Sequence, residues 1–125
     1  MRWKPDAYPD VSPYLLVKDA ERTLQFLEAA FGAHRLRIIP RDDGQGLMHA
    51  EARIGDSVVM MGETPDAVPA HIHVYVPDAD AAFAKAIAAG GLVVQPLTES
   101  GDGDRRGGIL DESGTTWWIS TQSGG

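Results

Sequence analysis

The sequence contains no cysteine. This absence excludes a disulfide framework, a thiolate zinc site and a cysteine nucleophile. No apolar run approaches the roughly 18 residues that a membrane-spanning helix needs. The first residues, Met1 to Pro5, do not lead into a signal peptide. We therefore expect a cytoplasmic protein with no membrane partner.

Basic side chains are also scarce. The chain has 11 lysines and arginines against 18 aspartates and glutamates, a formal net charge of −7. Nonspecific nucleic-acid binding depends mainly on lysine and arginine contacts to phosphate, so we expect no nucleic-acid partner. Excess negative charge instead favours the approach of a cationic small molecule. The length of 125 residues corresponds to one domain.

The first half of the chain follows the order β-α-β-β-β. Asp19 has the position of a helix N-cap, apolar residues at helical spacing follow it, and Gly32 is expected to end the helix. The dipeptide Gly55-Asp56 is expected to join the last two strands in a two-residue turn. The strands expected in this half cover residues 11–17, 34–39, 48–54 and 57–61.

The second half repeats this order at a constant offset of 59 residues. Matching residues lie at helix caps, helix ends and turns, where backbone geometry restricts the residue type. They pair Asp19 with Asp78, Gly32 with Gly91, and Gly55 with Gly114. The strands expected in this half cover residues 71–76, 93–98, 109–110 and 115–121. We predict a single domain over residues 1–125, with module one at about 11–62, a linker at 63–70 and module two at about 71–121.

Four stretches carry a family resemblance. Two open the modules: Leu15-Leu16-Val17-Lys18-Asp19 and His71-Ile72-His73-Val74-Tyr75-Val76-Pro77-Asp78. Two close them: residues 54–60 (IGDSVVM) and 107–119 (GGILDESGTTWWI). Together they resemble the vicinal oxygen chelate superfamily, which includes glyoxalase I, extradiol dioxygenases, fosfomycin-resistance enzymes and bleomycin-resistance proteins. The closing stretches are most similar to its PhnB-like, glyoxalase/bleomycin-resistance branch.

The resemblance implies an α+β fold. Two βαβββ modules would form an eight-stranded, cup-shaped sheet around the ligand, with the helices outside. Such modules commonly pair between chains, so the resemblance also implies a homodimer, with or without exchanged modules.

Enzymes of this superfamily hold a divalent metal ion with four side chains, one from the first and one from the last strand of each module. The matching positions here are Ser12, Val59, His71 and Trp118. Only His71 is an ordinary metal ligand, whereas a catalytic metal needs about three histidine or carboxylate ligands and an open position. We therefore expect no metal, no other cofactor and no catalytic residue.

A shifted set of ligands is the alternative. His73 shares a strand face with His71, and His49 and Glu51 share a face of the neighbouring hairpin. A true two-residue turn at Gly55-Asp56 is expected to point His49 and Glu51 out of the cup, and a bulge would reverse this. With all four side chains in the cup, the function would be that of a metal-dependent lyase or dioxygenase of glyoxalase type.

The predicted ligand-binding surface is mostly apolar. Adjacent strand residues point to opposite faces, so Trp117 is expected in the core. Trp118 then either presents a flat ring for stacking on an aromatic or cationic ligand or fills the cup as core. The predicted ligand-binding residues are Tyr14, Leu16, Val59, Met61, His71, His73, Tyr75 and Trp118.

The charged stretch Glu99–Gly108 is expected to form a mobile loop over the cup mouth. Arg105 or Arg106 would there meet an anionic ligand, or the loop is simply solvated. The whole pattern favours a metal-free binding or sequestration protein of bleomycin-resistance type, which holds a planar or cationic small molecule. Resistance, carriage of an intermediate and metal-free catalysis are all compatible with it.

Overall fold

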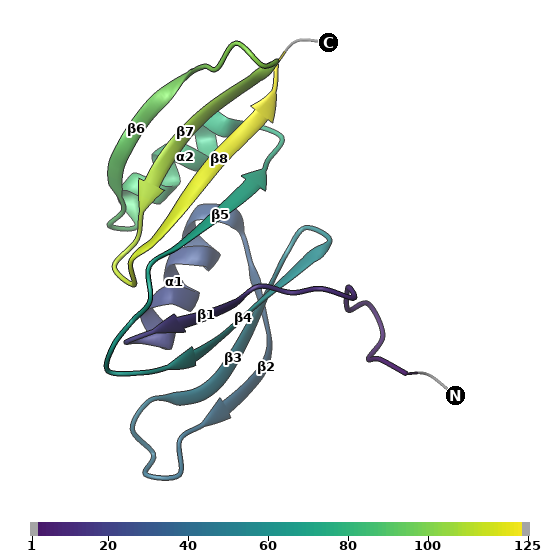
Figure 1. The fold of residues 1–125 in the computed structure, drawn as a ribbon, viewed down its shortest axis with the longest axis vertical. Coiled ribbons are helices and arrows are strands. Elements are labelled where there is room, and N and C mark those ends of the chain that lie inside the picture. The colour runs from purple at the N-terminus through teal and green to yellow at the C-terminus, as the bar shows by residue number, and fades with distance from the viewer. Residues whose placement is uncertain (1–2, 124–125) are drawn as a thin grey trace.

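The computed structural model describes residues 3–123, and the expected order of helices and strands occurs twice along them (Figure 1). The elements of the first half are β1 (Tyr14–Val17), α1 (Ala20–Phe31), β2 (His34–Pro40), β3 (Leu47–Ile54) and β4 (Ser57–Glu63). The elements of the second half are β5 (Ala70–Tyr75), α2 (Ala79–Ala88), β6 (Leu92–Glu99), β7 (Asp104–Leu110) and β8 (Thr115–Gln122).

Both helices begin at the predicted caps. The Asp19 side chain accepts a hydrogen bond from the backbone N–H of Arg22 at 3.1 Å, which satisfies one of the free N–H groups of the first turn of α1. Asp78 accepts one from Ala81 at the same distance at the start of α2. Gly32 ends α1 with a φ of 64°, a left-handed conformation that glycine adopts without a Cβ clash.

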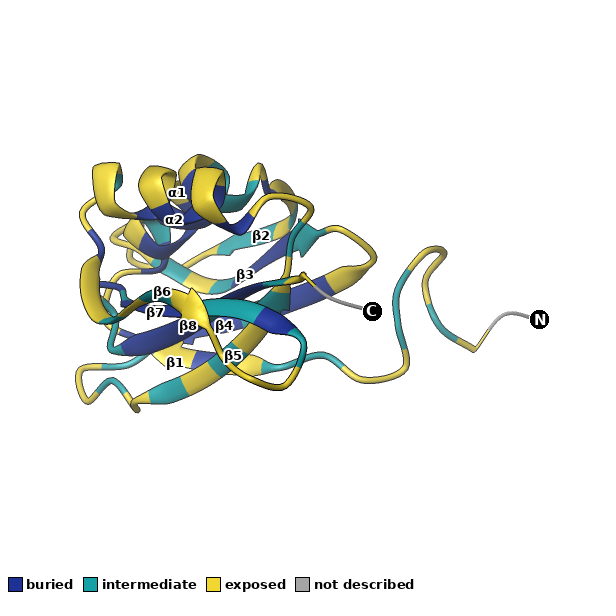
Figure 2. Ribbon diagram, turned by 90° about the horizontal axis from the view of Figure 1, so that it is seen from above, coloured by how far each residue is buried: buried dark blue, intermediate teal, exposed yellow. Residues whose placement is uncertain are grey.

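The eight strands divide between two four-stranded sheets, with the orders β1-β4-β3-β2 and β5-β8-β7-β6. Strand β1 is parallel to β4, and β5 is parallel to β8. The two helices pack against one another and lie together on one side of the sheets, and the opposite side carries no helix (Figure 2). The expected α+β class with paired βαβββ modules is confirmed. We call the side without helices the open face.

A single cluster of buried hydrophobic residues joins the two halves. Leu24 and Leu27 of α1 are fully buried in it, as their spacing along the helix predicts. The rings of Phe31 and Trp117, one from each half, lie 5.5 Å apart. Among the described residues, no helix has the length and apolar character needed to cross a membrane.

The expectation that Val59 and Met61 face the cup is wrong. Both lie in the core, 3% and 0% exposed, and Met60 between them lies beside Tyr14 on the open face. The repeat offset is not constant. His73, 59 residues after Tyr14, pairs with Trp118, which is only 58 residues after Met60. A slip of one residue along a strand turns every side chain to the other face.

The same slip reverses the expectation for β3. Gly55-Asp56 forms the predicted two-residue turn, with Ile54 opposite Ser57. Because Val59 faces the helices, its partner Ala52 does so too. His49 and Glu51 therefore lie on the open face, although the two-residue turn was expected to point them away from the cup.

The predicted loop Glu99–Gly108 is mostly strand. Strand β6 continues to Glu99 and β7 begins at Asp104, so only residues 100–103 turn. Arg105 donates two hydrogen bonds to Asp80 on α2, both 2.9 Å long, and Arg106 is bound to Asp102 at 2.5 Å. Both arginines thus lie on β7 rather than in a loop, and both guanidinium groups are paired with carboxylates.

Candidate functional site

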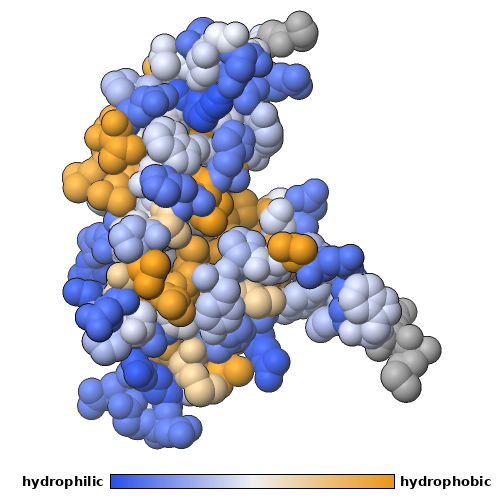
Figure 3. Space-filling model, viewed as in Figure 1, coloured by the Kyte–Doolittle hydropathy of each residue, from blue (hydrophilic) through white to orange (hydrophobic). Residues whose placement is uncertain are grey.

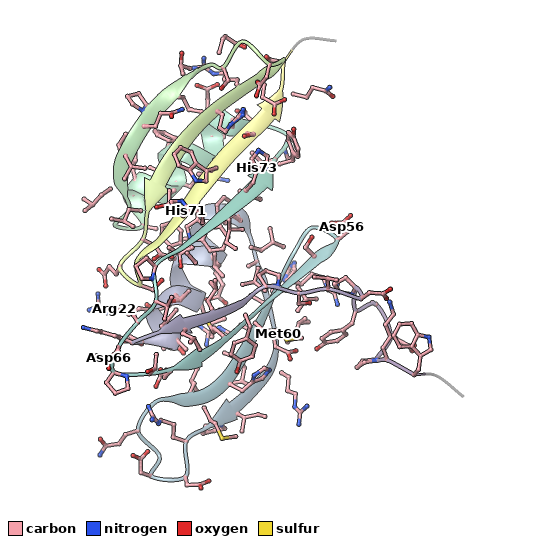
Figure 4. The ribbon with its side chains drawn as sticks, viewed as in Figure 1. Arg22, Asp56, Met60, Asp66, His71 and His73 are labelled. Carbon is pink, nitrogen blue, oxygen red and sulfur yellow. The ribbon has the colours of Figure 1, made fainter. Side chains whose placement is uncertain are left out.

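The open face carries most of the predicted site residues. Tyr14 and Leu16 of β1 are 50% and 42% exposed there, and Tyr75 of β5 is 63% exposed. Figure 4 shows His71 and His73 along β5 and Met60 on β4. Hydrophobic groups gather on this face along β6 and between the two sheets (Figure 3). Val59 and Met61 are the two predicted residues that it does not include.

Trp118 and His71 form one flat surface. Their ring planes differ by only 15°, with centroids 6.2 Å apart, and the indole Nε1–H donates to Nδ1 of His71 at 3.2 Å. Since an indole N–H lies in the plane of its ring, near-parallel rings joined by this bond lie side by side rather than one above the other. We call this pair the Trp118–His71 platform.

The indole of the platform lies over β7, where glycine leaves room for it. A Cβ at Gly108 would stand 2.8 Å from Cζ3 of Trp118 and 2.9 Å from Cγ2 of Val94. On the opposite face of the same strand, a Cβ at Gly107 would stand 2.6 Å from the Phe83 ring. The glycine pair therefore admits one aromatic ring on each side of β7.

A hollow of about 570 Å³ opens beside the platform. Its lining residues are His73, Gln95, Thr98, Glu99, Ser100, Asp102, Arg106 and Trp118. Two carboxylates and one guanidinium give the lining an excess of negative charge. The Arg106 guanidinium holds the pKa of the Asp102 carboxyl below its ordinary value through a direct hydrogen bond, so this carboxylate is charged at neutral pH.

The polar groups around the hollow are fixed in place. Nε2 of His73 lies 3.0 Å from the Ser120 hydroxyl. The Tyr75 hydroxyl donates to the buried Asp104 carboxylate at 2.7 Å, and that bond raises the pKa of Tyr75. The tyrosine is therefore a neutral donor at physiological pH.

On the first sheet, a chain of four side chains runs along the open face. The Tyr14 hydroxyl lies 3.1 Å from Nδ1 of His49, and Nε2 of His49 lies 2.7 Å from Oε2 of Glu51. Oε1 of Glu51 accepts from the Tyr8 hydroxyl at 2.5 Å. Sequence reasoning did not find Tyr8, because nothing in the sequence links it to a residue 43 positions later.

Glu51 is a charged group in a buried place, with 4% of its surface exposed. Burial alone would raise the pKa of this carboxyl, but the hydrogen bonds from His49 and Tyr8 outweigh it and the pKa is lowered. A carboxylate with a depressed pKa contributes stability that is present at neutral pH and lost as the pH falls through the folded-state pKa.

We therefore expect the free energy of unfolding to fall more steeply below about pH 4 in the wild type than in Glu51→Gln, whose amide does not titrate. Urea unfolding across this pH range measures the effect. Glu99→Gln, which replaces an exposed carboxylate, is the control and should keep the wild-type slope. Equal slopes for the wild type and Glu51→Gln would contradict the assignment.

The donor groups do not fit a metal ion. Among residues 3–123, no three His, Cys, Asp or Glu side chains come together in a way that could hold one. Of the four positions that match the family's metal ligands, Val59 lies in the core and Trp118 is hydrogen-bonded to His71. In the shifted set, both ring nitrogens of His49 are occupied by Tyr14 and Glu51.

A second hollow, of about 520 Å³, lies on the helix side where the two halves meet. Phe26 and Ala29 of α1 line it, and Arg22 is bound to Glu112 at 2.7 Å beside it. None of the predicted site residues takes part. Its charged groups come in both signs, and the ion pair between Arg22 and Glu112 ties the first half of the chain to the second.

Comparison with known proteins agrees with this architecture. Residues 11–119 match the family model described as the Glyoxalase/Bleomycin resistance protein/Dioxygenase superfamily. Mb0911c, an uncharacterised protein of Mycobacterium bovis, is 37% identical in an aligned region that covers 87% of this chain and 80% of the length of Mb0911c. TioX from Micromonospora sp. ML1 superposes with a TM-score of 0.78 at 25% identity, covering 91% of this chain and 98% of its own. The fosfomycin resistance protein FosX from Mesorhizobium loti shares the fold, with a TM-score of 0.66 at 19% identity over 90% of each chain.

Proposed function

Because the chain belongs to the glyoxalase/bleomycin resistance protein/dioxygenase superfamily, we propose that it binds a planar, cationic small molecule on its open face without a metal ion. The observation that carries this proposal is the Trp118–His71 platform. Two near-parallel rings joined by a hydrogen bond offer a flat area larger than one indole, and such an area suits face-to-face contact with a fused aromatic ligand.

Charge supports the cationic character of the ligand. The chain has a net charge of −7, and the hollow beside the platform has more carboxylates than guanidinium groups in its lining. The face of an indole also attracts cations through its quadrupole. A negative surface mainly speeds the encounter with a cation, while stacking and burial of apolar area hold the ligand.

Proflavine, a planar cation, is a suitable probe. We expect its dissociation constant, measured from the shift of the dye's absorbance, to rise at least about tenfold in Trp118→Ala, because stacking and apolar burial are both lost. Trp3→Ala removes a tryptophan that is 78% exposed in the N-terminal segment, and it should leave the dissociation constant unchanged.

Two outcomes would refute this proposal. One is proflavine affinity that does not depend on Trp118. The other is a stoichiometric content of nickel, zinc, iron or manganese in protein purified without chelator, lost in His71→Ala. A stoichiometric metal content would instead favour the function of a metal-dependent lyase or dioxygenase.

A homodimer would complete the cup. Within the described part of the chain the two sheets share no strand pairing, and large apolar side chains such as Leu16, Leu92 and Val94 are 42%, 65% and 50% exposed. Pairing of two chains across their open faces would cover these side chains and enclose a ligand between first-half and second-half sheets. Sedimentation velocity is expected to give twice the monomer mass, and a monomer at micromolar concentration would contradict this arrangement.

A further inference from the structure

The open face of the second sheet changes in polarity along its strands. At one end, Leu92 of β6 is the strand partner of Leu110 of β7. Arg106 lies toward the other end of β7, and Gly108 between them is the strand partner of Trp118 on β8. Alternate residues of a strand point to the same face. The indole of Trp118 therefore separates an apolar end of this face from a polar end.

The apolar end is exposed and continuous with the platform. Leu92 and Val94 of β6 are 65% and 50% exposed, and Figure 3 shows the hydrophobic groups along this strand. Val94 and Trp118 lie over the same glycine, since a Cβ at Gly108 would stand within 3 Å of both side chains. We call Leu92, Val94 and Leu110 the apolar strip.

The polar end is the hollow of about 570 Å³ beside the platform. Its lining contains the carboxylates of Glu99 and Asp102 and the guanidinium of Arg106. Arg106 is bound to Asp102 at 2.5 Å. Glu99 lies 4.0 Å from the guanidinium of Arg105, which is itself bound to Asp80. The negative charge of Glu99 therefore attracts a cationic group to this end of the face.

Strand β6 is poorly suited to pairing with a strand of another chain, although it lies at the edge of its sheet. It contains Pro96, which has no N–H to donate. Its pairing with β7 shifts register on both sides of Gln95, and such irregularities oppose edge-to-edge association. The apolar strip alone is also far smaller than the roughly 800 Å² per partner that a stable protein interface buries. A small molecule therefore fits the strip better than a second strand does.

We propose that the ligand of the open face is an amphipathic cation, whose planar ring lies on the Trp118–His71 platform and whose apolar chain runs over the apolar strip toward Leu92. The inference rests on the proposed function and adds two features to it, an apolar chain and a fixed orientation. The positive charge of the ring is directed toward the hollow, and the chain extends away from it.

Two dyes with the same permanently charged ring test for the chain. They are 10-methyl-acridine orange and 10-nonyl-acridine orange, used below the concentration at which the nonyl dye aggregates. Burial of one methylene raises an affinity by about fourfold. We expect the wild type to prefer the nonyl dye by at least about fiftyfold, which corresponds to three buried methylenes.

Leu92→Ser is expected to reduce this preference by at least about fourfold, because the end of the chain loses an apolar contact. Leu92 is largely exposed, so the variant is expected to fold. Val93→Ser is the matched control. Val93 is the next residue of the same strand, but its partner Ile109 lies in the core, so Val93 points to the helix side. This variant should keep the preference.

Glu99→Gln tests the orientation. Both dyes carry the same charged ring, so loss of this exposed carboxylate is expected to weaken their binding by the same factor, about two- to fivefold. The preference for the nonyl dye should therefore stay unchanged. A loss of affinity confined to the nonyl dye would place the chain in the hollow and overturn the proposed orientation.

The outcomes separate the inference from the proposed function. Binding of both dyes through Trp118 without a preference, or with a preference that Leu92→Ser keeps, overturns the role of the apolar strip and leaves the platform intact. An equal loss of preference in Val93→Ser would show nonspecific adhesion of the chain and would overturn it too. Failure of both dyes to bind, or binding that Trp118→Ala leaves unchanged, overturns the proposed function itself.

Discussion

Asp111→Ala is expected to lower the free energy of unfolding by about 2–4 kcal/mol. Asp111 is 5% exposed and directly follows β7, at the start of the turn that leads to β8. One carboxylate oxygen accepts from the backbone N–H of Ser113 at 2.8 Å and of Thr115 at 3.1 Å, and from the Ser113 hydroxyl. The other oxygen accepts from Nε1 of Trp117 at 2.8 Å. Truncation leaves several buried donors without partners, and each costs its desolvation free energy.

Thermal or urea unfolding followed by circular dichroism measures this loss. Asp111→Asn keeps one oxygen acceptor but directs N–H groups at remaining donors, so an intermediate loss is expected. Glu112→Ala is the control, since Glu112 forms only an exposed ion pair with Arg22 and should change stability by less than about 1 kcal/mol. A loss in Asp111→Ala no larger than that of Glu112→Ala would show that the hairpin does not depend on the buried carboxylate.

The adjacent glycines of β7 should respond differently to the same methyl group. Gly107→Ala directs it at Phe83 and at the Leu97 backbone N, 3.0 Å away, and we expect a loss of about 1–3 kcal/mol by overpacking of the core. Gly108→Ala directs it at Trp118 on the open face. It should tilt the indole out of the plane of His71 and raise the proflavine dissociation constant at least about tenfold.

The two variants serve as each other's control. Melting temperature and dye affinity are measured for both variants. We expect the larger loss of proflavine affinity in Gly108→Ala. We expect a lower melting temperature in Gly107→Ala, because its methyl group overpacks the core. Unchanged proflavine affinity in Gly108→Ala would mean that the flat arrangement of the two rings does not matter for binding.

Local signals in the sequence were sufficient for the order of elements. A capping aspartate at Asp19 or Asp78 and a left-handed glycine at Gly32 each act within one turn of the chain, so their patterns can be read without knowing the fold. The resemblance added the paired modules, which the two sheets bear out.

Which side chains of β3 and β4 point to the open face and which to the core could not be predicted from such local signals. It depends on a one-residue difference between the repeats, which places Met60 rather than Val59 at the position of Trp118. The four residues from Val58 to Met61 are all apolar, so hydrophobicity alone does not show which of the two strand faces packs against the helices. Adjacent glycines such as those at 107–108 usually indicate a turn or loop, whereas here they make room for Phe83 and Trp118 on a strand.

The most direct test of the platform uses the indole N–H signals. The chain has three tryptophans, and their Nε1–H groups differ in surroundings: Trp3 is exposed, Trp117 is bound to Asp111, and Trp118 is bound to His71. In a ¹H–¹⁵N correlation spectrum of metal-free protein titrated with proflavine, the Trp118 signal is predicted to shift to saturation while the Trp3 and Trp117 signals stay in place. A saturable shift at Trp3, or no shift at Trp118, would contradict binding on the platform.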